Sequence, residues 1–369
     1  MYNKIKVLLK QEAVLFVLLI LFIFLTAFMP GYMSQYPDFV DWKTIITLLA
    51  LIITATGIKE SGYLEKIAGQ MLVKIHDERS LAFVLVFLSI VLSAFLTNDI
   101  ALFIVVPLTL CIHSILNKDP VKIVIFEALA VNAGSSLTPI GNPQNIFLWN
   151  KWGISFASFI IKMLPLVLLM VVVLSVFIII VFKKNRLKIA GDTVKISVKT
   201  KLGILSFIIM LLFLISLQFK MEVWMLPAIA LVYLVFYRKV MAGVDWLLIL
   251  TFIFMFIDFS MISRIPAVQN LIMNVNMTKN GDVFVLSALI SQIMSNVPAA
   301  IFISKFSGNW QAVTFGVDIA GNGIIIGSLA NIIAIRFLKP KDNRVWVNFH
   351  KYSVPYFLIT GFAVWFIIK

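Results

Sequence analysis

Long apolar runs, separated by short charged loops, make up most of the chain. One helix needs roughly 20 apolar residues to cross a bilayer, so this pattern predicts an all-α, polytopic membrane protein. Two pairs of apolar segments, 81–97 with 100–116 and 283–295 with 297–304, are expected to return to the side from which they start, as re-entrant hairpins. The predicted spans are 13–29, 43–58, 123–149, 154–182, 202–218, 224–237, 245–262, 312–335 and 352–368.

Two of the predicted spans contain residues that interrupt a helix. The stretch NAGSSLTPIGNPQNIF at 132–147 holds two prolines and two glycines among hydroxyl and amide side chains. A second stretch, 318–331, combines glycines with asparagines. Unpaired peptide groups cost several kcal/mol in lipid, so nonhelical backbone persists there only against protein or a water-filled cavity. The pattern therefore predicts two broken transmembrane helices.

An internal repeat links these features. AVNAGSSLTPIGNPQNI (130–146) aligns without a gap to GVDIAGNGIIIGSLANI (316–332), with five identities in seventeen positions. SAFLTNDIA (93–101) resembles SQIMSNVPA (291–299), and an Asp-Trp pair opens both 41–58 and 245–262. The two copies, about 41–150 and about 245–336, would cross the membrane in opposite directions. An inverted repeat of this kind is a common plan of secondary transporters, with the binding site at the breaks.

Composition and charge placement agree with a membrane protein. Of 369 residues, 61% are hydrophobic and 13% charged, which excludes an ordinary soluble domain, and we expect one integral domain over 1–369. The net charge of +14 is concentrated in 183–201, with seven basic residues against one acidic, and in 336–351. Basic loops mark the cytoplasmic side and favour anionic lipid headgroups.

This charge pattern predicts a multi-pass protein of the cell membrane with a cytoplasmic N-terminus and a basic cytoplasmic linker at 183–201. The partner that it indicates is the lipid bilayer and not nucleic acid. Residues 59–80 are expected to form an amphipathic helix on the inner surface. The single cysteine, Cys111, excludes a disulfide framework or a thiolate metal cluster within the chain.

The tips of the two predicted hairpins are the first candidate site residues. At a re-entrant tip, exposed carbonyls of one arm can hold a cation, and free N–H groups of the other can hold an anion. The alternative is an ordinary surface turn, in which Asn and Asp are common. The candidates are Thr97, Asn98 and Asp99 at one tip, and Ser295 and Asn296 at the other.

The two breaks supply neutral ligands suited to Na⁺ or to an oxyanion. Their glycines permit close backbone approach, and close helix packing through small residues is the alternative interpretation. The candidates are Ser135, Ser136, Thr138, Gly141, Asn142 and Asn145 in the first break, and Gly321, Asn322, Gly327, Ser328 and Asn331 in the second.

Acidic residues at membrane depth are candidates for cation binding or proton transfer. Asp99 lies at a tip, and Asp318 precedes the second break. Asp258 lies within a long apolar run, where a structural hydrogen bond or ion pair is an equally good interpretation. Glu127 is expected to reach the membrane surface, and His113 to be a packing residue.

Four motifs resemble the ion transporter superfamily, which includes arsenite permeases, divalent anion–sodium symporters, citrate transporters and some sodium/proton antiporters. They are TNDIALFIVVP (97–107), TPIGNPQN (138–145), SNVPAA (295–300) and GVDIAGNGIIIGSLAN (316–331). The resemblance implies a scaffold with a mobile transport domain, a homodimer and elevator-like motion. It also implies one half-site at Asn98 and 138–145, and another at Asn296 and 321–331.

These observations predict a secondary active transporter of a small anion, driven by Na⁺ or H⁺, and not an enzyme. No cofactor is expected, and no metal beyond a transported or coupling Na⁺. The tips TND and SNV stand where dicarboxylate symporters have Ser-Asn-Thr, which weakens a sodium–dicarboxylate assignment. An arsenite/antimonite efflux permease and a sodium/proton antiporter remain alternatives.

Overall fold

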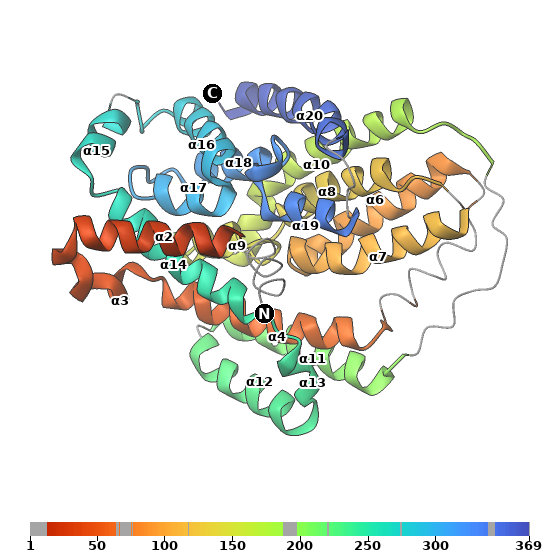
Figure 1. Ribbon diagram of the computed structural model, residues 1–369, viewed down its shortest axis with the longest axis horizontal. Coiled ribbons are helices and arrows are strands. Elements are labelled where there is room, and N and C mark those ends of the chain that lie inside the picture. The colour runs from red at the N-terminus through yellow and green to blue at the C-terminus, as the bar shows by residue number, and fades with distance from the viewer. Residues whose placement is uncertain are drawn as a thin grey trace, which may run out of the picture.

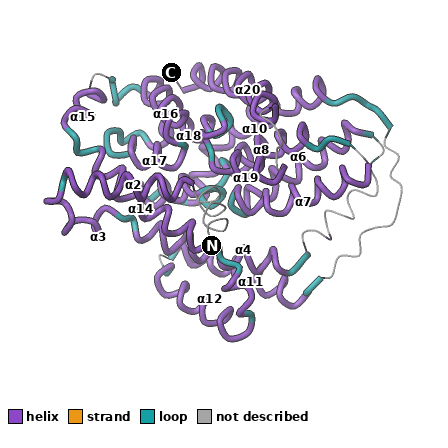
Figure 2. Tube along the Cα trace, viewed as in Figure 1, coloured by secondary structure: helices purple, strands orange, loops and turns teal. Residues whose placement is uncertain are grey.

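The computed structural model describes residues 13–63, 66, 75, 77–116, 118–186, 198–219, 221–273, 275–338 and 344–368. These residues form helices joined by loops and turns, with no extended strand among them (Figure 2). The predicted amphipathic helix at 59–80 and the basic linker at 183–201 fall largely outside the described residues, so both stay predictions.

Five helices in the described part are long and apolar enough to cross a membrane. They are α4 (Trp42–Glu60), α6 (Glu78–Phe95), α10 (Phe156–Val181), α11 (Thr200–Gln218) and α20 (Arg344–Ile368). The last begins well before the predicted residue 352, because RVWVNFHK contains no residue that stops a helix. The chain also turns by 117° after α2 (Ala13–Phe28), where Pro30 opens the 3₁₀ helix η1 (Pro30–Gln35) that leads into α3 (Tyr36–Phe39).

The helices fall into two groups in Figure 1. The scaffold group consists of α2, α4, α11, α12 (Glu222–Phe236) and α14 (Trp246–Ile262), in which α4 packs on α11 and α12, and α14 packs on α2. The short α13 (Arg238–Ala242) joins α12 to α14, and α15 (Pro266–Met273) follows α14. The bundle group consists of α6 to α10 and α16 to α20, and lies above the scaffold group in the figure.

The bundle group contains two sets of helices packed in the same way. In one set α6 packs on α8, and in the other α16 packs on α18; likewise α7 packs on α19, and α17 on α9. The hairpins are α6 with α7 (Asn98–Leu116) and α16 (Asn280–Met294) with α17 (Asn296–Ile303). The broken helices are α8 (Val121–Ser135) with α9 (Pro143–Trp152), and α18 (Trp310–Ala320) with α19 (Leu329–Leu338).

A glycine lies at each of the two equivalent hairpin–helix crossings. A Cβ atom on Gly134 would collide with the Ile90 carbonyl of α6, and one on Gly316 would lie 2.6 Å from the Phe284 carbonyl oxygen of α16. Small residues let two helices approach closely in a membrane, where packing replaces the hydrophobic effect as the main attraction. The observed fold is thus the predicted one: an inverted repeat with two hairpins and two broken helices.

The Asp-Trp pairs that open α4 and α14 form the same local structure. Asp41 accepts a hydrogen bond from the Thr44 N–H at 3.0 Å, and Asp245 accepts one from the Leu248 N–H at 3.0 Å. Both tryptophan indoles donate to a backbone carbonyl five residues earlier. An Asp at this position satisfies an N–H group that a helix start leaves unpaired.

Candidate functional site

The first break runs from the end of α8 at Ser135 to the start of α9 at Pro143. Asn142 caps α9, because its side-chain oxygen accepts from the Asn145 N–H at 2.9 Å, and Pro143 has no N–H to satisfy at the first helical position. At the other end, the Ser136 hydroxyl donates to the Asn132 carbonyl at 2.8 Å. Side chains of the loop therefore pair with backbone groups at both ends of the break.

The second break runs from Ala320 through the 3₁₀ helix η2 (Ile325–Gly327) to the start of α19 at Leu329. In both breaks a glycine lets the loop fold back onto the helix that it follows. A Cβ on Gly141 would collide with the Ser135 carbonyl, and one on Gly327 would lie 2.7 Å from the Ala320 carbonyl oxygen. These two glycines occupy equivalent positions in the repeat.

Asn132 connects the first broken helix to the second break. Its amide nitrogen donates to the Gly321 carbonyl at 2.8 Å and to the Asn331 side-chain oxygen at 2.9 Å. Its own side-chain oxygen accepts from the Ser328 hydroxyl at 3.0 Å. Every polar atom of this buried amide therefore has a partner.

Asp318 makes the reciprocal connection from the second broken helix to the first break. Its Oδ1 accepts from Gln144 Nε2 at 3.1 Å and from Asn142 Nδ2 at 3.3 Å. Its Oδ2 has no hydrogen-bond partner among the described residues, although the side chain is only 2% exposed. We call the residues joined in this way, together with Asn145, the central cluster: Asn132, Asn142, Gln144, Asn145, Asp318, Ser328 and Asn331.

Several atoms around Asp318 are also buried without a partner in the described part of the chain. They include both polar atoms of the Asn145 side chain and the side-chain oxygen of Gln144. An unpaired buried carboxylate is costly, and the start of α9 offsets this cost only in part through its helix dipole. A carboxylate among amide oxygens is a suitable environment for a proton or for a hard cation, which prefers oxygen ligands.

The first hairpin tip is tied to the first break. The Asn98 N–H donates to the Gly141 carbonyl at 2.9 Å, and the Asn98 side chain accepts from the Asp99 N–H at 3.0 Å. The Thr138 hydroxyl donates to the Ala94 carbonyl at 2.6 Å, just before the tip. Two hydrogen bonds thus join the first tip to the first break.

The second tip is tied to its break by a different residue. Gln292 donates to the Ala320 carbonyl at 2.9 Å and accepts from the Ile324 N–H at 2.8 Å. Asn296 mirrors Asn98, since its side chain accepts from the N–H of the next residue, Val297, at 2.9 Å. Ser295 has a φ of 75°, a conformation that costs energy in a residue other than glycine.

Sequence reasoning missed three residues that the structure brings into these contacts: Asn132, Gln144 and Gln292. The repeat alignment contained a signal for two of them. It places Asn132 opposite Asp318, and Gln292 opposite Ala94, whose carbonyl receives the Thr138 hydrogen bond. Gln144 is polar and lies inside the first break, but nothing in the sequence distinguished it from the other amides there.

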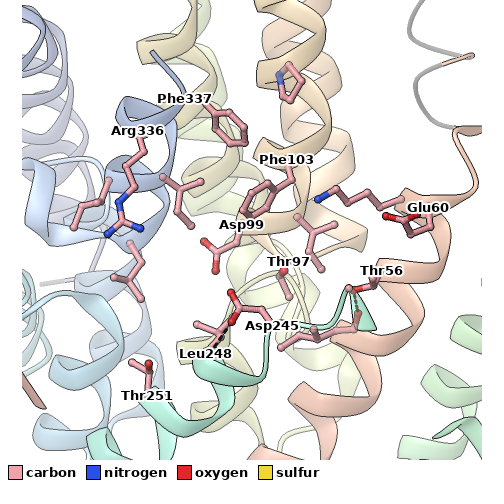
Figure 3. Close-up of a pocket in the computed structure, with 18 of the residues that line it drawn as sticks. Thr56, Glu60, Thr97, Asp99, Phe103, Asp245, Leu248, Thr251, Arg336 and Phe337 are labelled. Atoms are coloured by element: carbon pink, nitrogen blue, oxygen red, sulfur yellow. Dashed lines mark hydrogen bonds between the residues drawn. The ribbon is translucent and has the colours of Figure 1, made fainter. Parts of the chain in front are cut away.

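A cavity of about 850 Å³ lies between part of the scaffold group and part of the bundle group. Figure 3 shows Asp99, Asp245 and Arg336 facing the same space from α7, the start of α14 and α19. Asp99 Oδ1 has no hydrogen-bond partner among the described residues. On the α4 side, the Lys59 ammonium lies 4.3 Å from the centre of the Phe103 ring. The cavity therefore reaches the first tip, where Thr97 also lines it.

Two acidic residues lie apart from the central cluster. Asp258, on α14, is fully buried, and neither of its carboxylate oxygens has a hydrogen-bond partner in the described part of the chain. Glu127 was expected to reach the membrane surface, and this expectation was wrong: its side chain is 0% exposed. It is enclosed by the surrounding helices, and Thr109 of α7 donates a hydrogen bond to it.

Comparison with known proteins agrees with this architecture. The profile of the citrate transporter family matches residues 7–309. The chain belongs to the citrate transporter family. It is 38% identical over 334 residues to the inner membrane protein YbiR of Escherichia coli, covering 90% of this chain and 89% of that one. It is 39% identical over 303 residues to the uncharacterized transporter MJ0456 of Methanocaldococcus jannaschii, covering 80% and 81%.

A solved structure shares the fold of this family member. The YdaH transporter of Alcanivorax borkumensis superposes with a TM-score of 0.51 at 13% identity, covering 93% of this chain and 88% of that one. The family match ends before the second break, whose residues 318–331 lie beyond it. The family match and the apolar helices make the chain a multi-pass membrane transporter. The chemistry of its second break follows from the residues of this chain.

Proposed function

We propose that this family member is a secondary active transporter of a small anion, coupled to Na⁺ or H⁺, that works by elevator-type alternating access. The observation that carries the proposal is the partnerless Oδ2 of Asp318, buried between the two breaks. A fixed negative charge in this place requires a positive partner in at least one state of the cycle. A proton or Na⁺ from solution can supply that charge, and its binding then couples to transport.

The anion would bind beside this cation at the hairpin tips. Asn98 and Asn296 are the first residues of α7 and α17, so the N-terminal ends of both helices lie at the tips. Helix N-termini attract anions through the helix dipole. Positive charge from a bound cation would further offset the repulsion between Asp318 and an anionic substrate.

The elevator motion is supported by the contact between the two helix groups. The cavity lies at one side of this contact. At another side, the Phe147 ring of α9 packs against the Phe256 ring of α14. A hydrogen bond from Asn150 to Thr44, at 3.3 Å, is a weak polar contact between α9 and α4. A mainly apolar contact can slide without leaving buried polar groups unpaired. We also propose that the scaffold group forms a homodimer.

Uptake by purified protein in lipid vesicles tests this function. Na⁺ and proton gradients are imposed separately, with radiolabelled citrate, succinate, sulfate or arsenite as the probe. We expect one of the two gradients to drive accumulation of an anion, and Asp318→Asn to abolish the accumulation. Glu222→Gln, in the scaffold group, is the matched control. Failure of both gradients to drive any of these probes would overturn the proposal, as would full activity in Asp318→Asn.

A sodium/proton antiporter is the second candidate, because five buried acids each carry an oxygen without a described partner: Asp99, Glu127, Glu222, Asp258 and Asp318. Cation exchange needs acids of this kind and no anion site. In the same vesicles, an outward Na⁺ gradient that drives proton uptake without any added anion would favour this function. Arsenite efflux is tested by the arsenite arm of the panel.

A further inference from the structure

Glu127 is a buried acid that neither the central cluster nor the cavity accounts for. It lies in the middle of α8 with 0% of its side chain exposed. The Thr109 hydroxyl donates to its Oε1, and its Oε2 has no hydrogen-bond partner among the described residues. A carboxylate in this position would be an uncompensated charge in a low-dielectric interior, which a bound proton removes.

A line of contacts connects Glu127 with the surface of the bundle. Thr109 and His113 lie one turn apart on α7, and His113 Nδ1 contacts the Thr109 carbonyl at 2.9 Å. The His113 side chain is 7% exposed, and its carbonyl accepts from the Lys118 N–H at 3.0 Å. At the surface, the Lys118 ammonium pairs with Glu78 at 3.3 Å. His113 is therefore a titratable side chain one helical turn from Thr109, the residue that donates to the buried acid.

The same helix connects Glu127 with the central cluster. Glu127 and Asn132 are five residues apart on α8, about 8 Å along the helix axis. The route is separate from the cavity, because the residues of α7 that line the cavity include Asp99, Phe103 and Leu110, whereas Thr109 is fully buried. Substrate and proton would thus approach the centre on different faces of α7.

Among the described residues, no charged group near α8 forms an ion pair with Glu127. Helix α8 packs against α6, α7, α10, α18, α19 and α20. On α8 itself, the Lys122 ammonium lies over the Phe182 ring, 5.5 Å from its centre. The described titratable and charged side chains on the packed helices are Glu78, Arg79, Asp99, His113, Lys162, Asp318, Arg336, Arg344, His350, Lys351, Tyr352 and Tyr356.

We propose that Glu127 is a proton-binding site of the transport cycle, distinct from the central cluster and reached from the surface along His113 and Thr109. The proposal rests on the proposed function and assigns H⁺ as a coupling ion. Water delivers the proton, the carboxylate becomes a neutral carboxylic acid, and release of the proton to water restores the carboxylate. No other reactant takes part.

Infrared titration of the purified protein in lipid tests the site without any substrate. The wild type should show a pH-dependent carbonyl band of a protonated carboxylic acid that is missing in Glu127→Gln and shifted in Glu127→Asp. Glu222→Gln, the matched control from the scaffold group, should keep the band. An identical titration in the wild type and in Glu127→Gln would overturn the proposal.

Transport assays distinguish a role of Glu127 in proton coupling from a role in stabilising the folded protein. With citrate as the probe, one pH unit across the membrane and one coupled proton should give about tenfold accumulation, since one unit corresponds to 1.36 kcal/mol. Glu127→Gln should lose this accumulation but keep citrate counterflow, which needs no net proton movement. His113→Asn should slow the proton-driven phase.

The outcomes distinguish the two proposals. Equal loss of counterflow and accumulation in Glu127→Gln would indicate a structural role and overturn the proton site, as would retention of both. A wild type without citrate counterflow would count against citrate as the transported anion, while the infrared titration would still decide whether Glu127 binds a proton.

Discussion

Asn132 and Asp318 occupy the same position in the two halves of the repeat and differ by one side-chain group. Each lies in the last turns of the first arm of a broken helix, and each reaches into the break of the other half. The amide of Asn132 satisfies all of its polar atoms, whereas the carboxylate of Asp318 leaves Oδ2 without a described partner. An amide has both donors and an acceptor, but a carboxylate has acceptors only.

This difference indicates a division of labour between the halves. Asn132 holds the two breaks together, because it provides two donors to oxygens of the second break. Asp318 receives two donors from the first break and still has acceptor capacity for a proton or a cation. We therefore interpret the first half as the structural partner and the second as the ion-binding partner.

Asp318→Asn tests this difference most strongly and should have the largest effect. Removing the charged partner of a buried ion costs about 3 kcal/mol or more, which is about a hundredfold in cation affinity. We expect coupled transport to be lost while the melting temperature stays at or above the wild-type value. Asp318→Glu should retain part of the activity. Cation-driven transport by Asp318→Asn at the wild-type rate would contradict the division of labour.

Asn132→Ala should instead lower stability. It leaves the Ser328 hydroxyl and the Asn331 side-chain oxygen buried without a partner, at about 1–3 kcal/mol for each group. The measurement is thermal unfolding in detergent, with Asn150→Ala as a control that removes a single hydrogen bond of 3.3 Å at the edge of the bundle. Equal melting temperatures for the two variants would show that Asn132 does not hold the breaks together.

The hydrogen bonds that join the tips to the breaks give a comparison with a smaller expected loss of stability. Gln292→Ala removes two hydrogen bonds of 2.9 and 2.8 Å, whereas Thr138→Val removes one of 2.6 Å. At about 0.5–1.5 kcal/mol for each bond, Gln292→Ala should be the more destabilising change. Protease resistance or unfolding of the two variants side by side checks the order, and the reverse order would count against it.

The helix caps should give the smallest effect. Asp41→Ala and Asp245→Ala each remove an N-cap worth about 1 kcal/mol. Only Asp245 faces the cavity together with Asp99, another acid, so its removal also relieves repulsion between like charges. Asp245→Ala should therefore destabilise the protein less than Asp41→Ala does, as measured by thermal unfolding. A larger loss at Asp245 would show that the cap outweighs the repulsion.

The sequence by itself determined the fold class and the places where helices break. Apolar runs of spanning length, prolines 139 and 143, and glycines such as Gly141 act through local backbone chemistry, which needs no knowledge of distant neighbours. The Asp-Trp starts of α4 and α14 are equally local, and their caps follow from residues three positions apart.

Only the tertiary structure decided which polar side chains are paired. Sequence reasoning missed Asn132 and named Asp318 as an acid at membrane depth, and the partners of both come from segments more than 170 residues away. The sequence placed Glu127 near a helix end and suggested that it reaches the surface, but packing against α7 encloses it. Pairing depends on contacts between helices that are distant in sequence, so the amide at one position is fully paired and the carboxylate at the equivalent position keeps an oxygen without a described partner.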